Sequence, residues 1–326
     1  MASPSSTLTT LRPDLSGSLE EFDLATDRLG FIGYKVLPVM DVASQAGTFG
    51  VIPVEQLLKA GTLERAPSAP YSRDTFTFTE GSYACIERGH EEPVDDRDAA
   101  RFSNYFDAEV IAAQRASDRL LREAEKRVAA AIFNATTWTG ATLTTAVSIP
   151  WTTLATAVPI DNIYAAKLKV LALCGMWPNT LICTRLAYMN LRRCAQITAA
   201  VASTGAGDSI LQGRITTQQI AQALDIEQIL VAGGSKNTAI EGQDAVFASV
   251  WDDTQAMLCR VARSNDIKEP CIGRVFHWGG DGSQLQGATE TYRDETVRSD
   301  IYRVRHDVQE KILYAATGHR LTAVTA

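Results

Sequence analysis

The longest regular pattern in the sequence is helical, and it extends from Asn104 to Asn134. At the usual helical rise, such a helix would be about 45 Å long, which exceeds what most compact domains can hold. No partner helix of similar length is expected elsewhere, which weakens the alternative of an ordinary helical bundle. We therefore expect a beam across a flat molecule. Its apolar positions recur in steps of three and four residues: Val110, Ala113, Leu120, Leu121, Ala124, Val128, Ala131 and Ile132.

The ends of this helix carry suitable polar residues. Ser103 or Asn104 can cap the start, and Asp107 and Glu109 suit the positive end of the helix dipole. Four cations suit the negative end, and two ion pairs with spacing of four residues are expected on the outer face. The cations are Arg119, Arg122, Lys126 and Arg127, and the pairs are Asp118 with Arg122 and Glu123 with Arg127.

The block from Gln45 to Tyr83 predicts a long hairpin. It begins with glycines around Phe49, then has a short possible helix at Val54–Lys59 and a proline-rich tip at Glu64–Pro70. A strand with period-two alternation follows at Thr75–Thr79. A hairpin of this length is marginally stable alone in water, so we expect it to contact a neighbouring subunit. An ordinary surface insertion remains an equal alternative at this point.

The rest of the chain predicts an α/β module followed by strands. The early segment Phe31–Val42, interrupted by Pro38, predicts an extended edge segment because proline cannot donate to a central ladder. We expect strands from opposite ends of the chain to lie together. The expected elements are helices at Ile160–Leu173, Leu186–Arg193 and Thr216–Ala223 (capped by Thr216 or Thr217), buried strands at Thr180–Cys183 and Gln228–Ala232, and β-like segments at Gly273–Trp278 and Asp300–Val324.

Composition limits the possible classes of protein. With 326 residues and 45% hydrophobic content, the chain can bury one large core or two that share a boundary. A formal charge of -7 argues against a protein whose main task is to bind nucleic acid, although a wall facing DNA remains allowed. No apolar stretch suits a membrane span and no signal peptide is visible, so we expect a soluble protein that is not secreted. The six cysteines are scattered along the sequence without a C-x-x-C pair, which predicts buried thiols in the reduced state.

No motif in the sequence supports catalysis, a cofactor or a metal. Gly233-Gly234-Ser235-Lys236 lacks phosphate-loop spacing, and Gly279–Ser283 lacks alternating acidic ligands, so both predict turns. The four histidines are far apart in the sequence. The acidic residues Asp95, Asp96 and Asp98 predict a solvated face that could equally bind a stray cation. We therefore predict no catalytic, cofactor or metal site.

The order and spacing of several segments resemble the major capsid proteins of tailed bacteriophages, which have the Hong Kong 97-like fold. The resemblance covers nearly the whole chain from about Phe31. None of the segments is a strict signature alone, but together they are fairly specific. They are Lys35–Val39, Arg65-Ala66-Pro67, Tyr83-Ala84-Cys85, Gly175–Leu181, Asn237-Thr238-Ala239 ahead of Val250-Trp251, and Gly273–Trp278.

The resemblance implies an α+β fold with four parts. These are an N-terminal arm (1–44), an extended β-hairpin loop (45–82), a peripheral domain (83–145 and 271–312) with a spine helix at about 104–134, and an axial α/β domain (146–270 and 313–326). The loop is expected to lie over the neighbouring subunit. Its predicted intersubunit contacts are Phe49, Arg65, Pro67, Pro70, Tyr71, Arg73, Phe76 and Phe78.

The resemblance also implies a function, which is self-assembly into the hexamers and pentamers of an icosahedral head. We expect a virion protein that is assembled in the bacterial host cytoplasm. The head would enclose double-stranded DNA, and the protein would contact this DNA only weakly and non-specifically. Further expected partners are a portal protein and possibly a decoration protein, with no membrane. Some family members carry an N-terminal scaffolding segment, and the polar arm here is too short for one. A separate scaffolding protein and no N-terminal cleavage are therefore expected.

Some members of the family join the loop to a neighbour covalently through a lysine. Lys59 lies in the loop, but the sequence indicates no partner for it, and we do not predict the reaction. Two alternatives remain open. One is an encapsulin-type nanocompartment shell, which shares the fold but holds enzyme cargo. The other, from a different class, is a soluble α/β enzyme.

Overall fold

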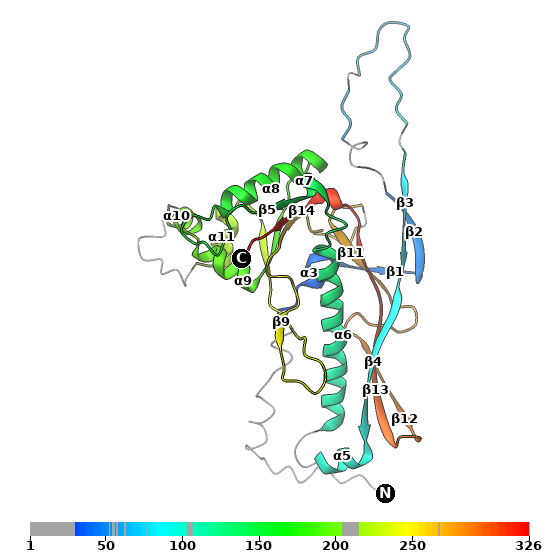
Figure 1. The fold of residues 1–326 in the computed structure, drawn as a ribbon. Helices are drawn as coiled ribbons and strands as arrows, with labels where there is room; N and C mark the ends of the chain where they lie inside the picture. Colours follow the sequence, from blue (N-terminus) through cyan, green and yellow to red (C-terminus); the bar gives the residue numbers. More distant parts are fainter. Residues whose placement is uncertain are drawn as a thin grey trace.

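The computed structural model describes residues 30–325 except 52, 54, 55, 57, 62, 76, 103–106, 204–214 and 267. Two bodies of packed helix and sheet lie side by side, and a long hairpin extends from one of them (Figure 1). Most of the predicted N-terminal arm lies outside the described residues. In the described part of the chain, no helix is long and apolar enough to span a membrane.

The predicted long helix is present as α6 (Ala108–Ile132), and it has 25 residues. At the usual rise, α6 is about 38 Å long. Asp107 is its N-cap and accepts hydrogen bonds from the backbone N–H groups of Glu109 and Val110. The expected caps Ser103 and Asn104 lie outside the described residues, and the prediction that the helix begins there is wrong.

The charges of α6 differ in part from expectation. No basic residue lies in its last turn, so the predicted interaction of cations with the negative end is wrong. The Asp118–Arg122 pair is confirmed, with a nitrogen–oxygen distance of 2.8 Å. The second predicted pair is wrong, because Glu123 pairs with Lys126 and Arg127 pairs with Glu310 on another element. The cations of α6 therefore face neighbouring strands and the surface rather than the helix end.

A sheet of five strands packs against α6. In the order of the chain, the strands are β1 (Val39–Val42), β4 (Ile86–Asp95), β11 (Gly273–Trp278), β12 (Ala288–Asp294) and β13 (Ser299–Ile312). The long strand β13 pairs with β4, β11 and β12. Apolar side chains of α6 fill the interface: Leu120 packs with Val304, and Val128 and Ile132 join a larger cluster around Val275 and Val308.

The two ends of the chain meet in this sheet. β1 runs parallel to β11 at the sheet edge, with Val39 opposite Val275, which confirms the expected pairing of distant strands. The extended segment predicted from Phe31 is confirmed only at β1. Gly33–Val36 forms a helical turn, α3, since its backbone bonds locally: the N–H of Val36 donates to Ile32 and that of Leu37 to Gly33.

The second body is an α/β unit. Its sheet has the order β5 (Thr144–Ala146), β14 (Gly318–Thr322), β10 (Ala256–Cys259), β6 (Thr180–Thr184) and β7 (Gln228–Ala232). Every residue of β6 is buried, which confirms the buried strand predicted at Thr180–Cys183. The helices of this unit are α7 (Gly140–Leu143), α8 (Pro159–Cys174), α9 (Arg185–Arg193), α10 (Ala195–Ser203) and α11 (Thr217–Ala223).

The predicted helices and strands of this α/β unit are confirmed. Thr216 caps α11 through a capping box with Gln219, which satisfies free N–H groups at the helix start.

The six cysteines are buried and unpaired, as expected. Burial raises the pKa of Cys183 to about 12 and that of Cys194 to about 11, so these thiols stay protonated.

Glu125, in the C-terminal half of α6, joins three parts of the molecule. Its carboxylate accepts hydrogen bonds from the backbone N–H groups of Ile32 (2.9 Å) and Gly33 (2.7 Å) and from Nε1 of Trp251 (2.6 Å). The residue is 4% exposed, and burial raises its pKa while the three donors oppose that rise. A Cβ at Gly33 would lie 2.5 Å from Oε2, so this close approach requires glycine.

Replacing Glu125 with glutamine should strongly destabilise the protein. The amide NH₂ group would face an N–H donor, which leaves a buried donor unsatisfied at a cost of about 2–3 kcal/mol. Chemical denaturation of the purified protein measures the change. Glu123→Gln, on the same helix but exposed, is the matched control and should shift stability by less than about 0.5 kcal/mol. Equal stability of E125Q and E123Q would contradict the role assigned to Glu125.

Two buried histidines should make stability depend on pH. Burial lowers the pKa of His306 and of His319 from 6.5 to about 4. Below pH 6.5 the unfolded chain binds protons that the folded chain does not, so stability should fall until about pH 4, by about 3 kcal/mol per histidine. Denaturation midpoints measured across this range should show that H306Q and H319Q each flatten the curve. A slope unchanged in both variants would refute this assignment.

Candidate intersubunit surface

The hairpin predicted between residues 45 and 82 is present and begins as two paired strands. β2 (Ala46–Val51) and β3 (Thr79–Ala84) pair antiparallel, with Ala46 opposite Ala84 and Val51 opposite Thr79. The strand predicted at Thr75–Thr79 is therefore displaced, because regular pairing starts at Thr79. Within the predicted helix Val54–Lys59, three residues lie outside the described set, so that element stays a prediction.

The base of the hairpin is fixed by aromatic packing. Tyr83 stacks on Phe276 of β11 at a centroid distance of 4.8 Å, and Phe49 lies 5.7 Å from the same ring. A Cβ at Gly81 would lie 2.6 Å from the Phe49 ring, so a glycine is needed opposite that side chain. The N–H of Ala84 also donates to the side chain of Gln309 (2.6 Å). The hairpin is thus held firmly where it leaves the sheet.

Beyond β2 and β3, the two limbs continue past the α/β unit, and their tip projects away from both bodies (Figure 1). Gln56 exchanges two hydrogen bonds with Thr77, and Lys59 pairs with Asp74 across the limbs at 2.8 Å. The predicted tip turn is confirmed by a hydrogen bond from the N–H of Ala69 to the carbonyl of Ala66. These contacts are exposed, so they contribute little to holding the limbs in place.

The limbs present apolar side chains to solvent. Leu63 is 82% exposed, Tyr71 71% and Phe78 67%. The guanidinium of Arg65 lies over the Tyr71 ring, with 4.8 Å between Cζ and the ring centroid. Large apolar groups on a projecting segment are typical of a surface that another chain covers.

The residues predicted to contact a neighbouring subunit differ in their exposure. Arg65, Pro67, Pro70, Tyr71, Arg73 and Phe78 are exposed on the limbs, whereas Phe49 is half-buried at the base and packs on Phe276. Phe76 lies outside the described residues. Sequence reasoning missed Leu58 and Leu63, although apolar residues inside a polar loop were a usable signal. Leu58 also approaches Gly175 of the α/β unit, so this part of the loop contacts its own molecule.

Further exposed apolar residues lie on the α/β unit. Tyr164 and Leu168 stand on the outer face of α8, and Leu186 and Met189 on that of α9. Trp177, between α8 and β6, is half-exposed. An α/β unit with apolar groups on its outer helices has a second surface suited to association.

The structure also places the glycine-rich segments and acidic residues that were considered as possible phosphate or metal sites. The turn predicted at Gly233–Lys236 is limited to a two-residue link between β7 and β8 (Ser235–Asn237), because Ser235 and Lys236 already belong to β8, whereas the turn predicted at Gly279–Ser283 is confirmed by the bond from the N–H of Gly282 to the carbonyl of Gly279. β8 pairs with β9 (Phe247–Ser249). Asp96 starts the short helix α5 (Asp96–Phe102) and pairs with Arg293 at 2.5 Å. Within the described residues, no three His, Cys, Asp or Glu side chains are arranged to hold a metal.

No protein-family model matches the sequence, and no curated protein matches it. Several solved structures, however, match the fold of this chain. A phage-related protein from Bordetella bronchiseptica RB50 has a TM-score of 0.65 at 19% identity, with 96% of this chain and 97% of that chain covered. The mature capsid of bacteriophage PhiM1 has a TM-score of 0.56 at 12% identity, with coverages of 87% and 85%. The holo-SrpI encapsulin complex from Synechococcus elongatus PCC 7942 has a TM-score of 0.50 at 10% identity, with coverages of 97% and 96%.

This likeness extends over most of the chain and shows the fold. The predicted α+β Hong Kong 97-like capsid fold is confirmed, and the structural neighbours are mainly phage capsid proteins.

Removing the aromatic contact at the hairpin base should loosen β2 and β3. Tyr83→Ala deletes the ring stacked on Phe276, a pair worth about 1 kcal/mol beyond its buried area. Amide hydrogen exchange across Gly47–Val51 should become about tenfold faster or more. Tyr71→Ala, in the exposed part of the same hairpin, is the control and should leave those amides unchanged in dissociated subunits. If Y83A exchanges like the parent protein, the anchoring role of the stack is wrong.

Proposed function

We propose that this chain is the major capsid protein of a tailed bacteriophage, which assembles as hexamers and pentamers into an icosahedral head around double-stranded DNA. The observation that carries the proposal is the projecting hairpin. Its base is packed on the sheet, while Leu63, Tyr71 and Phe78 on its limbs are exposed. The confirmed fold, shared with phage capsid structures over most of their length, supports the same function.

Shell assembly follows from this geometry. A projecting loop makes a heterologous contact, in which one surface of a subunit meets a different surface of its neighbour. Such contacts close into rings when the rotation between subunits allows it. Each contact buries a modest area, but every subunit in a ring is held by its two neighbours, so the assembled ring is far more stable than one contact.

The proposal includes a structural rather than enzymatic role and a location in the virion shell. We assign the hairpin limbs, including Arg65, Pro67, Pro70, Tyr71, Arg73 and Phe78, to contacts with neighbouring subunits. The first body, with α6, corresponds to the peripheral domain, and the α/β unit corresponds to the axial domain. The formal charge of -7 is consistent with a capsid wall that does not bind the phosphates of DNA strongly, so that the packed DNA can move.

Other components follow from the proposed role. A portal protein would provide the DNA entrance, a separate scaffolding protein would guide assembly in the host cytoplasm, and a decoration protein would bind outside the shell. An encapsulin-type compartment is the second candidate, and the likeness to the holo-SrpI encapsulin favours it specifically. The contents of purified particles separate the two candidates, since a phage head contains long DNA and an encapsulin contains enzyme cargo.

Removing the exposed apolar side chains of the hairpin should prevent assembly without unfolding the subunit. The variant combines Leu63→Ser, Tyr71→Ser and Phe78→Ser, and it is expressed with the other virion proteins and examined by electron microscopy. We expect hollow particles from the parent chain and at least about tenfold fewer from the variant, because exposed positions matter little to subunit stability. Circular dichroism should show equal folding of both proteins.

A second variant serves as the control. Ser72→Ala with Glu80→Gln changes exposed residues of the same hairpin without removing apolar surface, and it should form particles normally. Normal particles from the triple variant would contradict the assigned role of the hairpin. If the parent chain forms a monomer or a small oligomer and no particle, the proposed function itself is wrong.

A further inference from the structure

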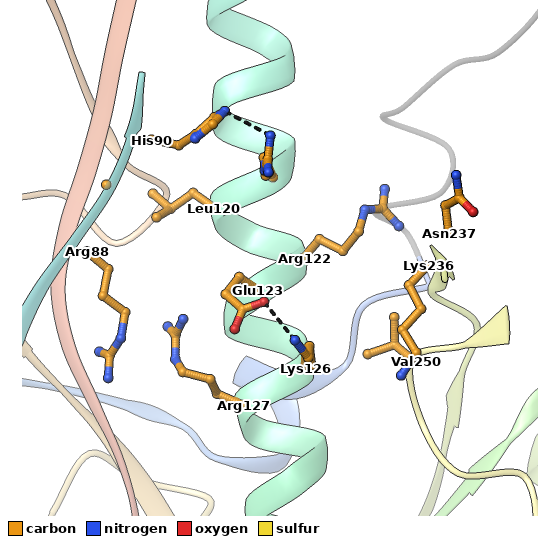
Figure 2. A pocket seen from close by; sticks show the side chains of 12 residues that line it. Arg88, His90, Leu120, Arg122, Glu123, Lys126, Arg127, Lys236, Asn237 and Val250 are labelled. Carbon is orange, nitrogen blue, oxygen red and sulfur yellow. Dashed lines mark hydrogen bonds and ion pairs between the residues drawn. The ribbon is translucent and has the colours of Figure 1, made fainter. Parts of the chain in front are cut away.

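A basic groove runs along the exposed side of α6 (Figure 2). It lies between β4 on one side of the helix and the β8–β9 hairpin on the other, and its volume is about 340 Å³. A groove lined by charges of one sign concentrates ions of the opposite sign. The described residues that line this groove include one acidic residue, Glu123, and six cations: Arg88, Arg119, Arg122, Lys126, Arg127 and Lys236.

The acidic partners of these cations are too few to neutralise the groove. Three of the cations have a carboxylate partner at 2.8–3.4 Å: Arg122 with Asp118, Lys126 with Glu123, and Arg127 with Glu310. The other three have no carboxylate of the described residues at ion-pair distance, and they are Arg88, Arg119 and Lys236. The groove thus keeps about three positive charges without a carboxylate partner.

Two of the arginines point toward one another, Arg88 from β4 and Arg127 from α6 (Figure 2). Burial lowers the pKa of Arg88, and the charge of Arg127 lowers it further, with a larger effect than the opposing one of Glu310. The two guanidinium groups are therefore close enough to repel one another. His306 adds no negative charge here, because burial lowers its pKa to about 4 and the ring is neutral at pH 7. An anion between Arg88 and Arg127 would be attracted by both.

Arg127 also has a donor without an acceptor. Its Nε donates to Oε1 of Glu310 (3.0 Å), and its Nη2 lies 3.4 Å from Nε2 of His306. Its Nη1 is buried and has no hydrogen-bond partner among the described residues. A buried donor without an acceptor is costly, so this arrangement favours an acceptor that enters from the groove. Arg88 bonds to the carbonyl of Val308 through Nη1 (2.7 Å), which orients its guanidinium from the opposite wall.

We propose that the basic groove binds a phosphate-type oxyanion between Arg88 and Arg127, with Arg119 and Lys236 adding to the attraction. The oxygens of a tetrahedral oxyanion point in several directions, so they can accept from guanidinium groups on opposite walls at once. A carboxylate has only two oxygens in one plane and carries less charge than a phosphate dianion. The inference rests on the residues of the groove and does not depend on the proposed function.

Phosphorus NMR of inorganic phosphate, titrated with the full chain at constant pH and chloride concentration, tests the proposal. Exchange with a bound state broadens the phosphate line, and the dependence on concentration gives the affinity. We expect saturable broadening by the parent protein. In a groove variant, Arg88→Gln with Arg119→Gln, the affinity should fall at least about tenfold, because bonds from charged donors are lost.

Circular dichroism shows whether this groove variant folds. Should its folding be impaired, Lys236→Gln provides an independent variant, since Lys236 borders the groove from β8 and has no carboxylate partner among the described residues. It should weaken phosphate binding about threefold, because it removes attraction without touching the two facing arginines. Unchanged phosphate affinity in whichever of these variants folds would overturn the proposal.

A matched control removes two arginines elsewhere. Arg185→Gln with Arg193→Gln changes exposed residues of α9 and lowers the positive charge by the same amount as the groove variant. It should bind phosphate like the parent protein. Equal loss of affinity in this control and in the groove variant would mean that only net charge matters, which would overturn the site. So would a parent protein that does not broaden the phosphate line in a saturable way.

Competing ligands identify the class and source of the anion. Acetate at the same concentration should not displace phosphate, and displacement by acetate would overturn the preference for a tetrahedral oxyanion. A short DNA duplex carries the same phosphate chemistry. If the duplex displaces inorganic phosphate from the parent protein, the site is supported with the nucleic-acid backbone as its source of phosphate. If it does not, while inorganic phosphate binds, the site is supported with the free anion as its ligand.

Discussion

The carboxylate of Glu125 is the interaction on which the rest of the structure depends. It lies inside the molecule and accepts three N–H donors, two from the segment that leads into β1 and one from Trp251 ahead of β10. A buried charge of this kind is costly unless all its bonds are made, and then it specifies one arrangement of the groups around it. The helix, the N-terminal entry and the loop before the second sheet are therefore fixed relative to one another.

The hairpin combines a fixed base with open limbs. Aromatic stacking on Phe276 and the bond from Ala84 to Gln309 set the direction in which β2 and β3 leave the sheet. Farther out, the described residues of the limbs make only exposed bonds to one another, and Tyr71 and Phe78 expose their rings. A segment with a set direction and adaptable ends can meet a neighbouring subunit at slightly different angles, as the proposed assembly into both hexamers and pentamers would require.

Much of this fold could be predicted from the sequence, and each error has a physical reason. The periodicity of α6 was sufficient to predict the helix, but its start was wrong because Asp107 caps it more locally than the polar run before it suggested. The alternation at Thr75–Thr79 predicted a strand, yet pairing begins at Thr79, where Gly81 allows Phe49 to approach. That choice depends on Phe276, far away in the sequence. The basic groove beside α6 was also missed, because β4, α6 and β8 each contribute cations that come together only in the fold (Figure 2). These cations are Arg88, Arg119, Arg122, Lys126, Arg127 and Lys236.

The strand β13 has 14 residues, and it pairs with β4 on one side along Ser299–Val308 and, on the other, with β12 along Ser299–Arg305 and then β11 along Val308–Ile312. Its inter-strand bonds run across the chain direction, as in any antiparallel ladder. A stretching force applied along β13 therefore loads many bonds in shear at once, and none can be opened singly from an end. If subunits assemble as proposed, tension along β13 would therefore be resisted by the whole ladder and not by one bond.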